Sequence, residues 1–172
     1  MSRIMICGLN GSGKTTLGKE LSKKINFIHK DIEDYYFTHN IDYKYNYSAT
    51  KEEVIPKIEK DIKECDNIIF TSCKGNYGNL SDVYDLVIFI RLDKDTRLKR
   101  VKQRSYKQFG DRVLMNGDLF ERENQFFDKV YNRDESDIIE WFNNLKCEKL
   151  ELDGLKLVEE NINSILDKLK DM

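Results

Sequence analysis

Short apolar runs alternate with longer amphipathic stretches along most of the chain. The apolar runs are rich in Ile, Val and Phe, and they predict strands over 3–7, 26–29, 67–72, 86–92 and 149–152. Near-continuous apolar runs of this length are typical of strands that are buried on both faces, as in a parallel sheet. Helical spacing of apolar residues predicts helices over 15–25, 51–64, 96–104, 119–131, 137–145 and 158–169.

The start of the second predicted helix carries its own signature. Thr50 and Glu53 have the spacing of a capping box, in which each side chain satisfies a backbone N–H of the other residue. Pro56, the only proline, lies just inside this helix, and proline is favoured in a first helical turn. The pattern therefore leaves open a true first turn a few residues after Lys51.

The alternation of strands and helices predicts βαβ units and an α/β fold. We expect a three-layer, doubly wound, five-stranded parallel sheet, in which ligands bind beyond the carboxyl ends of the strands. The 172 residues fit one domain, 1–172. Two insertions interrupt the pattern: 35–65, whose first half holds five of the nine tyrosines, and 105–118, which contains two glycines.

Composition and charge exclude several classes of protein. The chain has 29 Lys and Arg against 31 Asp and Glu, so its charge of -2 offers no global positive field for a long nucleic acid. No apolar run reaches 18 residues, and the first 14 residues break into Gly and polar residues too early for a secretion signal. We therefore expect a soluble, cytoplasmic protein without a membrane partner. Four dispersed cysteines indicate neither a zinc site nor a disulfide framework.

The most specific motif follows the first predicted strand. Residues 8–15 read GLNGSGKT, which satisfies the phosphate-loop pattern G-x-x-x-x-G-K-[ST] at the start of a helix. Backbone N–H groups of such a loop close around phosphate oxygens, Lys14 reaches the β- and γ-phosphates, and the Thr15 hydroxyl ligates Mg²⁺. The motif predicts ATP and Mg²⁺ as cofactors. The predicted nucleotide contacts are Gly8, Asn10, Gly11, Ser12, Gly13, Lys14, Thr15 and Thr16.

Two branches of phosphate-loop proteins lack their other motifs here. A GTPase needs D-x-x-G and N-K-x-D elements, and neither occurs in a sensible place. A motor ATPase needs more length and an acidic end on the third strand, which here ends in Phe70-Thr71-Ser72-Cys73. The small kinases remain.

Within that branch, the whole chain resembles the adenylate kinase and shikimate kinase group of nucleotide and small-molecule kinases. Residues 29–36 read HKDIEDYY, similar to the acidic element that in shikimate kinase relatives holds Mg²⁺ and the acceptor hydroxyl. The resemblance implies that Asp31 orients the acceptor and binds Mg²⁺, with Asp34 as the second choice for the carboxylate or as a partner of Mg²⁺ through water. The alternative is that either aspartate only caps a helix that starts near Glu33.

Arginines cluster after the fourth predicted strand. Arg97, Arg100 and Arg104 share one helix face and look like the arginine-bearing helix that leads into the family's mobile lid, here 105–118. The resemblance implies that Arg104 and Arg112 act on the transferring phosphate as arginine fingers do. The alternative is a solvated basic face paired with Asp93, Asp95 or Glu121. Near the C-terminus, 152–156 look like the turn that borders adenine in adenylate kinases, which implies Gly154 as a nucleotide contact.

The residues expected to bind the acceptor differ from those of adenylate kinases. Residues 73–78 replace a family element that carries a carboxylate and an arginine, and positions 4–90 contain no arginine. A lysine lacks the bidentate fork that suits a planar phosphate clamp, so we expect a neutral hydroxyl acceptor rather than a nucleoside monophosphate. The predicted acceptor contacts are Asp34, Lys74, Tyr77 and Arg133. The residues that either line this pocket or pack the lobe are Tyr35, Tyr36, Phe37, Tyr43, Tyr45 and Tyr47.

Taken as a sequence, the chain is expected to be an ATP- and Mg²⁺-dependent kinase. Its acceptor is a nucleoside, nucleotide or similar hydroxyl metabolite. A nucleotide-gated sensor without phosphotransfer is the alternative, because the third strand lacks its carboxylate. The net charge of -2 disfavours the end of a polynucleotide as the acceptor. The basic stretch 99–107 leaves this alternative open. The identity of the acceptor and the oligomeric state are not specified.

Overall fold

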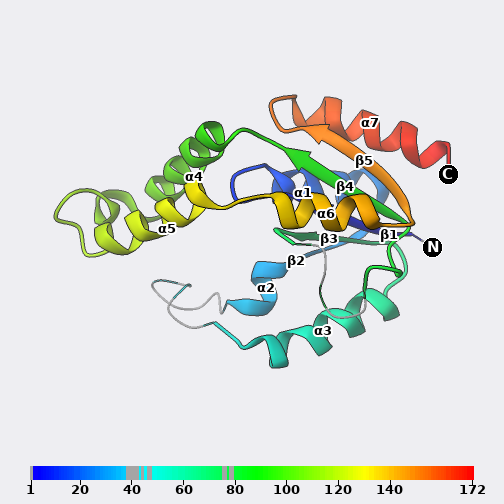
Figure 1. Cartoon of the computed structure of the whole chain (residues 1–172), viewed down its shortest axis with the longest axis horizontal. Coiled ribbons are helices and arrows are strands. Elements are labelled where there is room, and N and C mark those ends of the chain that lie inside the picture. The colour runs from blue at the N-terminus through cyan, green and yellow to red at the C-terminus, as the bar shows by residue number, and fades with distance from the viewer. Residues whose placement is uncertain (1, 38–42, 44, 46–47, 75–76, 78–79) are drawn as a thin grey trace.

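Five parallel strands form the centre of the molecule (Figure 1), in the order β2-β3-β1-β4-β5. The computed structural model describes residues 2–37, 43, 45, 48–74, 77 and 80–172. The strands are β1 (Arg3–Cys7), β2 (Ile28–Asp31), β3 (Ile68–Ser72), β4 (Leu86–Arg91) and β5 (Glu148–Asp153). This is the doubly wound α/β sheet that the sequence predicts.

Helices follow the strands and cover both faces of the sheet. They are α1 (Lys14–Ile25), α2 (Ile32–Tyr36), α3 (Lys51–Glu64), α4 (Lys94–Phe109), the 3-10 helix η2 (Gly110–Val113), α5 (Phe120–Asn132), α6 (Ser136–Asn144) and α7 (Val158–Lys170). Side chains of β1 alternate between two cores. Ile4 and Ile6 pack with α1 and α7, whereas Met5 and Cys7 pack with α3 and α6. Near-complete burial of β1, β3 and β4 explains their continuous apolar runs, whereas the edge strands β2 and β5 are largely exposed or partly buried.

Several predicted boundaries differ from the structure by one or more residues, and two of these differences have a clear local cause. The second strand begins at Ile28 and not at residue 26, because Asn26 ends α1 in the left-handed conformation (φ 56°), which Asn tolerates well. The fourth helix continues beyond Arg104 to Phe109 and ends at Gly110 (φ 60°). The first part of the predicted insertion 105–118 is therefore helical.

The α3 helix begins at Lys51, so the alternative of a later first turn is wrong. The capping box is formed, since the Glu53 backbone N–H donates to Thr50 Oγ1 (3.3 Å) and the Thr50 N–H donates to Glu53 Oε2 (2.8 Å). Pro56 lies inside the helix on its exposed side. Water can therefore satisfy the Glu52 carbonyl, which lacks an N–H partner at Pro56.

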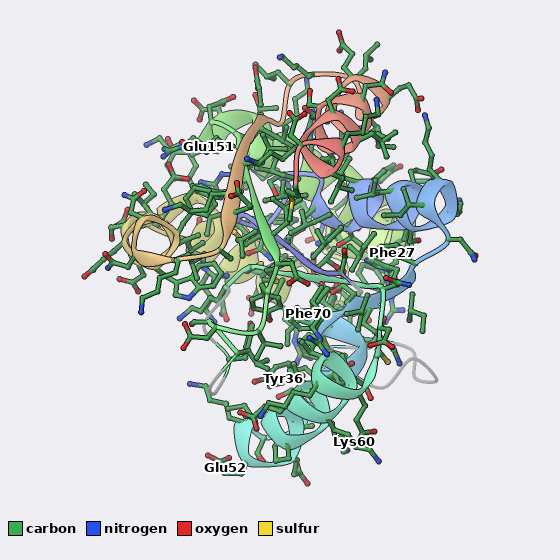
Figure 2. The ribbon with its side chains drawn as sticks, turned by 90° about the vertical axis from the view of Figure 1, so that its right-hand side faces the viewer. Phe27, Tyr36, Glu52, Lys60, Phe70 and Glu151 are labelled. Atoms are coloured by element: carbon green, nitrogen blue, oxygen red, sulfur yellow. The ribbon has the colours of Figure 1, made fainter. Side chains whose placement is uncertain are left out.

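Part of the tyrosine-rich segment packs the lobe. Figure 2 shows Tyr36 between Phe70 of the sheet and α3, whose residues Glu52 and Lys60 lie on its outer side. Tyr35 and Tyr36 pack against the core on this face, and the Tyr35 hydroxyl donates to Asp61 Oδ2 (2.6 Å). The packing interpretation is therefore confirmed for these two residues, whereas Tyr47 lies outside the described residues.

The helices α4 and α5 form an antiparallel hairpin that projects from the sheet, with residues 110–119 at its tip (Figure 1). In the part of the chain that the structure describes, no helix is both long and apolar enough to cross a membrane.

We predict that Thr50→Ala lowers the free energy of unfolding by about 1 kcal/mol, because it removes the side-chain acceptor of the capping box. Urea denaturation followed by circular dichroism measures the loss. Thr50→Ser keeps the hydroxyl and is the matched control, expected to retain most of the stability. Equal losses in both variants would contradict the capping role.

Candidate active site

The phosphate loop occupies the turn between β1 and α1 and presses against α4. Gly11 has a φ of 85°, and a Cβ atom there would lie 2.5 Å from the Arg97 carbonyl oxygen, so no larger residue fits. Lys14 is the first residue of α1 and is 8% exposed. The loop therefore places a lysine and a helix N-terminus at the carboxyl end of the central strand, where phosphate binds favourably.

A pocket of about 170 Å³ opens between this loop and α4. It is lined by Gly11, Gly13, Lys14, Thr15, Thr16, Arg100, Val101 and Arg104. The predicted arginine Arg104 and its neighbour Arg100 thus share the pocket with Lys14 and Thr15. Three cationic side chains around one small pocket provide the charge that a triphosphate requires.

Asp31 lies at the carboxyl end of β2 and is 5% exposed. Its Oδ2 atom accepts hydrogen bonds from the hydroxyls of Thr15 (2.7 Å) and Thr71 (2.8 Å). Its Oδ1 atom accepts from the Glu33 backbone N–H (2.9 Å) and so caps α2. Asp31 therefore fulfils the capping interpretation and contacts the phosphate loop as well.

These contacts keep Asp31 ionised. Burial by itself raises the pKa of the carboxyl, but the three hydrogen bonds and the charge of Lys14 outweigh it and hold the pKa below its ordinary value. Thr71 gives its single hydrogen to Asp31, so His29 Nε2 is the donor in the 3.1 Å contact between His29 and the Thr71 hydroxyl. Burial lowers the pKa of His29, which fits a neutral ring in this structural role.

The oxygen atoms of Thr15 and Asp31 fit a magnesium site. Mg²⁺ usually keeps several waters and binds one or two protein oxygens together with substrate phosphates. An ionised carboxylate 2.7 Å from the Thr15 hydroxyl, in the first turn of α1, supplies such a pair. Among the described residues, no cluster of three or more His, Cys, Asp or Glu forms a cage of its own. The ion would therefore be held jointly by this pair and the nucleotide.

A second pocket, of about 240 Å³, adjoins the first and shares Gly13, Thr16 and Arg100 with it. Its other lining residues are Ser12, Leu17, Ile90, Gly154, Lys156, Val158 and Asn161. Arg100 Nη2 donates to the Gly154 carbonyl (3.0 Å), which fixes the turn after β5 beside the loop. Gly154 thus lies where a group attached to a bound triphosphate would extend.

A third pocket, of about 490 Å³, lies on the other side of the loop. Asn10 belongs to the phosphate loop and lines this pocket, so the loop borders both the 170 Å³ pocket and this one. The remaining lining residues are Glu33, Phe37, Tyr43, Tyr45, Arg122, Gln125, Phe126 and Lys129. The volume is within the range of small-molecule sites.

Sequence reasoning missed the α5 side of this pocket. Residues 122, 125, 126 and 129 have the spacing of one helix face. The polar residues at the same spacing were the available signal. Glu33 was also missed, because Asp31 and Asp34 on either side of it matched the acidic pattern.

Two predicted arginines are not placed as expected. Arg97 is 5% exposed, and its guanidinium donates to the backbone carbonyls of Leu92 (3.1 Å) and Val130 (3.5 Å). It holds the hairpin together and is neither a solvated face nor a contact to phosphate. Arg112 forms a bidentate ion pair with Asp118 at the hairpin tip and lines none of the three pockets.

The predicted acceptor contacts scatter in space. Arg133 Nη1 donates to Asn10 Oδ1 (3.1 Å) and therefore lies at the wall between loop and third pocket. Asp34 and Lys74 are exposed and line none of the three pockets. The Tyr77 hydroxyl bonds to the Ser72 hydroxyl (2.7 Å), and its ring packs edge-on against Phe70. Of these four residues, Arg133 contacts the phosphate loop directly.

Solved structures share this fold. Deoxyadenosine kinase from M. mycoides with bound dATP superposes with a TM-score of 0.63 at 19% identity, over 99% of this chain and 100% of that one. Gluconokinase from Sinorhizobium meliloti 1021 gives 0.61 at 12% identity, over 99% and 92%. Shikimate kinase from Bacteroides thetaiotaomicron gives 0.61 at 18% identity, over 98% of each chain. The expected likeness to small kinases is confirmed at the level of the fold.

Sequence relatives agree with this placement. The chain is 28% identical to the uncharacterized protein YqaC of Bacillus subtilis (strain 168) over 179 residues, which cover 96% of each protein. A family model described as AAA domain matches residues 4–125, more than two thirds of the chain. The match includes the phosphate loop, Asp31 and the arginines of α4. The protein therefore belongs to the AAA domain family and has the fold of the small phosphate-loop kinases.

Proposed function

We propose that the protein is a kinase that transfers the γ-phosphoryl group of Mg-ATP to a hydroxyl group of a small acceptor. A nucleoside, a nucleotide or a similar hydroxyl metabolite is the acceptor class. The observation that carries this proposal is the position of Asn10, which belongs to the phosphate loop and lines a metabolite-sized pocket, so that this pocket adjoins the loop. An acceptor held there would meet the end of a triphosphate held by Lys14 and Thr15. A nucleotide sensor would not need such a second pocket.

The donor site supplies charge and position, which is most of what phosphoryl transfer requires. Lys14 would neutralise the β- and γ-phosphates, and Arg100 and Arg104 of α4 would approach them from the opposite side of the 170 Å³ pocket. Thr15 and Asp31 would hold Mg²⁺, which offsets charge on the phosphates when it is bound. The pocket beside Gly154 would receive the adenine base.

The acceptor carboxylate is better assigned to Glu33 than to Asp31. Both oxygens of Asp31 already accept hydrogen bonds from within the fold, and Asp31 does not line the third pocket. Glu33 lies two residues later, is partly buried and lines that pocket. The acceptor oxygen forms a bond to the γ-phosphorus as the bridging P–O bond to ADP breaks. The hydroxyl proton passes to the Glu33 carboxylate.

Both insertions contribute to the proposed acceptor side. Phe37, Tyr43 and Tyr45 from the segment 35–65 line the pocket, which supports its acceptor-binding role. The segment 105–118 forms the end of α4, η2 and the turn into α5. We infer that the whole α4-α5 hairpin, rather than this segment alone, acts as the lid, because α4 lines the donor pocket and α5 the acceptor pocket. Arg112 would help by bracing the tip through Asp118.

Release of ADP from Mg-ATP across a panel of nucleosides, nucleoside monophosphates, small alcohols and hydroxy acids tests the proposal. We expect one acceptor class to stimulate release, and Lys14→Ala to lower the stimulated rate about 100-fold or more through loss of phosphate neutralisation. Tight ATP binding without stimulation by any acceptor would favour the nucleotide sensor instead.

For Asp31→Asn we expect a higher Mg²⁺ requirement for turnover and a loss of stability that depends on pH. The native carboxyl has a lowered pKa, so ionisation stabilises the fold above the ordinary pKa of 3.8 and that contribution disappears as the pH falls through the native value. The gap in urea midpoint between wild type and variant should therefore narrow from pH 7 to pH 3. A constant gap would show that ionisation of Asp31 is not linked to folding.

Glu33→Gln is expected to lower kcat by about 100-fold to 10,000-fold, the range for loss of a general base, with the Kd for ATP nearly unchanged. Steady-state kinetics with the acceptor found in the panel, together with ATP titration calorimetry, measures both quantities. Asp34→Asn tests the competing assignment from the sequence. A large loss in Asp34→Asn with full activity in Glu33→Gln would overturn the assignment to Glu33.

A further inference from the structure

The helix α4 carries positive charge that the proposed active site does not use. Residues 96–109 contain six of the 29 Lys and Arg of the chain and none of its 31 Asp and Glu. The rest of the chain therefore has 23 Lys and Arg against 31 Asp and Glu, a formal charge of -8. The net charge of -2 is an average over these two unlike parts, so it is compatible with a basic surface on α4.

Half of these six cations have a role in the structure already. Arg97 is buried against backbone carbonyls, and Arg100 and Arg104 line the 170 Å³ pocket. The other three are lysines that line none of the three pockets: Lys99, Lys102 and Lys107. Neither the packing of the hairpin nor the donor site therefore explains their charge.

The three lysines lie on one exposed side of α4. Positions 99, 102, 103, 106 and 107 have the spacing of a single helix face, and all five residues are exposed. We call this surface the outer face of α4, formed by Lys99, Lys102, Gln103, Tyr106 and Lys107. Arg104 lies three residues before Lys107 and is therefore its neighbour on the helix surface. Positive charge thus continues from the phosphate pocket onto the outer face.

The charge of the outer face is not compensated. In the part of the chain that the structure describes, none of its three lysines forms an ion pair. Lys102 Nζ lies 5.4 Å from the centre of the Phe127 ring, a contact that supplies no counter-charge of its own. Like charges one helical turn apart destabilise a helix, and Arg104 and Lys107 have such a spacing. An anionic partner would remove this repulsion.

Tyr106 adds an aromatic ring to the same face. The residue is 50% exposed, and its hydroxyl donates to Asp111 Oδ1 (3.3 Å) at the hairpin tip. Proteins that bind single-stranded nucleic acid combine cations that follow the phosphates with aromatic rings on which bases stack. Lysines around an exposed ring provide both kinds of contact. Binding to an anionic membrane relies instead on aliphatic side chains among the lysines, and the outer face has none.

We propose that the outer face of α4 binds single-stranded nucleic acid. From Lys99 to Lys107 the face extends about 12 Å along the helix axis, so different phosphates of one strand meet separate cations. The ring of Tyr106 requires a base that is not paired, which favours a single strand over a duplex. Contacts to phosphates and base faces carry little sequence information, so we expect binding to be largely independent of base sequence. This activity is additional to the proposed phosphotransfer.

Fluorescence anisotropy with a labelled oligo(dT) of about 16 nucleotides tests the inference. Nucleotide is left out of the assay, so the result does not depend on whether the protein is a kinase. We expect a Kd of about 100 μM or tighter in dilute buffer. The logarithm of the binding constant should fall with the logarithm of the salt concentration with a slope of about -2, as three phosphates neutralised on a single strand require. A duplex of the same length should bind more weakly.

A variant that combines Lys99→Gln, Lys102→Gln and Lys107→Gln should bind the strand about tenfold or more weakly, with a salt slope close to zero. The matched control removes three exposed lysines of α3, which lies away from the hairpin (Figure 1), through Lys51→Gln, Lys57→Gln and Lys60→Gln. Both variants change the net charge equally. The control should therefore keep the affinity and the slope of the wild type if the outer face is the site.

The ring is tested separately from the charge. Tyr106→Ala should weaken binding about fivefold or more through loss of stacking. Tyr106→Phe loses the hydroxyl contact to Asp111 but keeps the ring, and it should bind as the wild type does. Circular dichroism checks that each variant is folded.

Three results would overturn the inference: no binding of oligo(dT) by the wild-type protein in dilute buffer, equal losses in the two triple variants, or tighter binding of vesicles of phosphatidylcholine and phosphatidylserine than of the strand. Equal affinity for duplex and single strand, without an effect of Tyr106→Ala, would also reject a single strand as the ligand.

Discussion

The hydrogen bond from Thr15 to Asp31 ties together the elements on which the site depends. It joins the first turn of α1 to the end of β2, and the second bond to Asp31 from Thr71 adds the end of β3. Asp31 also caps α2, so the same carboxylate sets where the chain turns toward Glu33 and Phe37 of the third pocket. Burial by itself disfavours the charged form of this carboxylate. The hydrogen-bond donors around Asp31 and the charge of Lys14 offset that cost, so the carboxylate stays charged.

This arrangement also explains how the third strand does without a carboxylate. β2 and β3 are paired in parallel, with Asp31 directly opposite Thr71. The acid on the edge strand therefore reaches the phosphate loop across its neighbour, and the hydroxyl of Thr71 supports it. The absence of an acidic residue after Phe70 was the sequence feature that favoured a nucleotide sensor. Because Asp31 on the paired strand supplies a carboxylate beside Thr71, that absence no longer argues for a sensor. A strand end is better judged together with the strand beside it.

Local patterns predicted the fold well, because each element has its own signal. The apolar runs gave all five strands, and the Thr50 and Glu53 pair gave the first residue of α3. The phosphate loop was recognisable because its chemistry depends on one continuous segment. Relations between segments were harder to predict. Arg97 and Arg104 share a helix and a charge, yet one is buried against backbone carbonyls and the other lines a pocket. That difference depends on where α5 packs, which the spacing of the arginines does not encode.

The third pocket shows the same limit in its charges. Its cations come from α5, more than 80 residues after Glu33 in the sequence, and they line the pocket together with Glu33, Phe37, Tyr43 and Tyr45. The buried Tyr43 to Glu123 bond joins these two parts of the chain. Burial raises the pKa of Tyr43 far above its ordinary value, and Glu123 raises it further, so the hydroxyl remains a donor. The Tyr43 ring that this bond holds also contacts the Arg122 guanidinium, so part of the shape and the charge of the third pocket depends on one buried hydrogen bond.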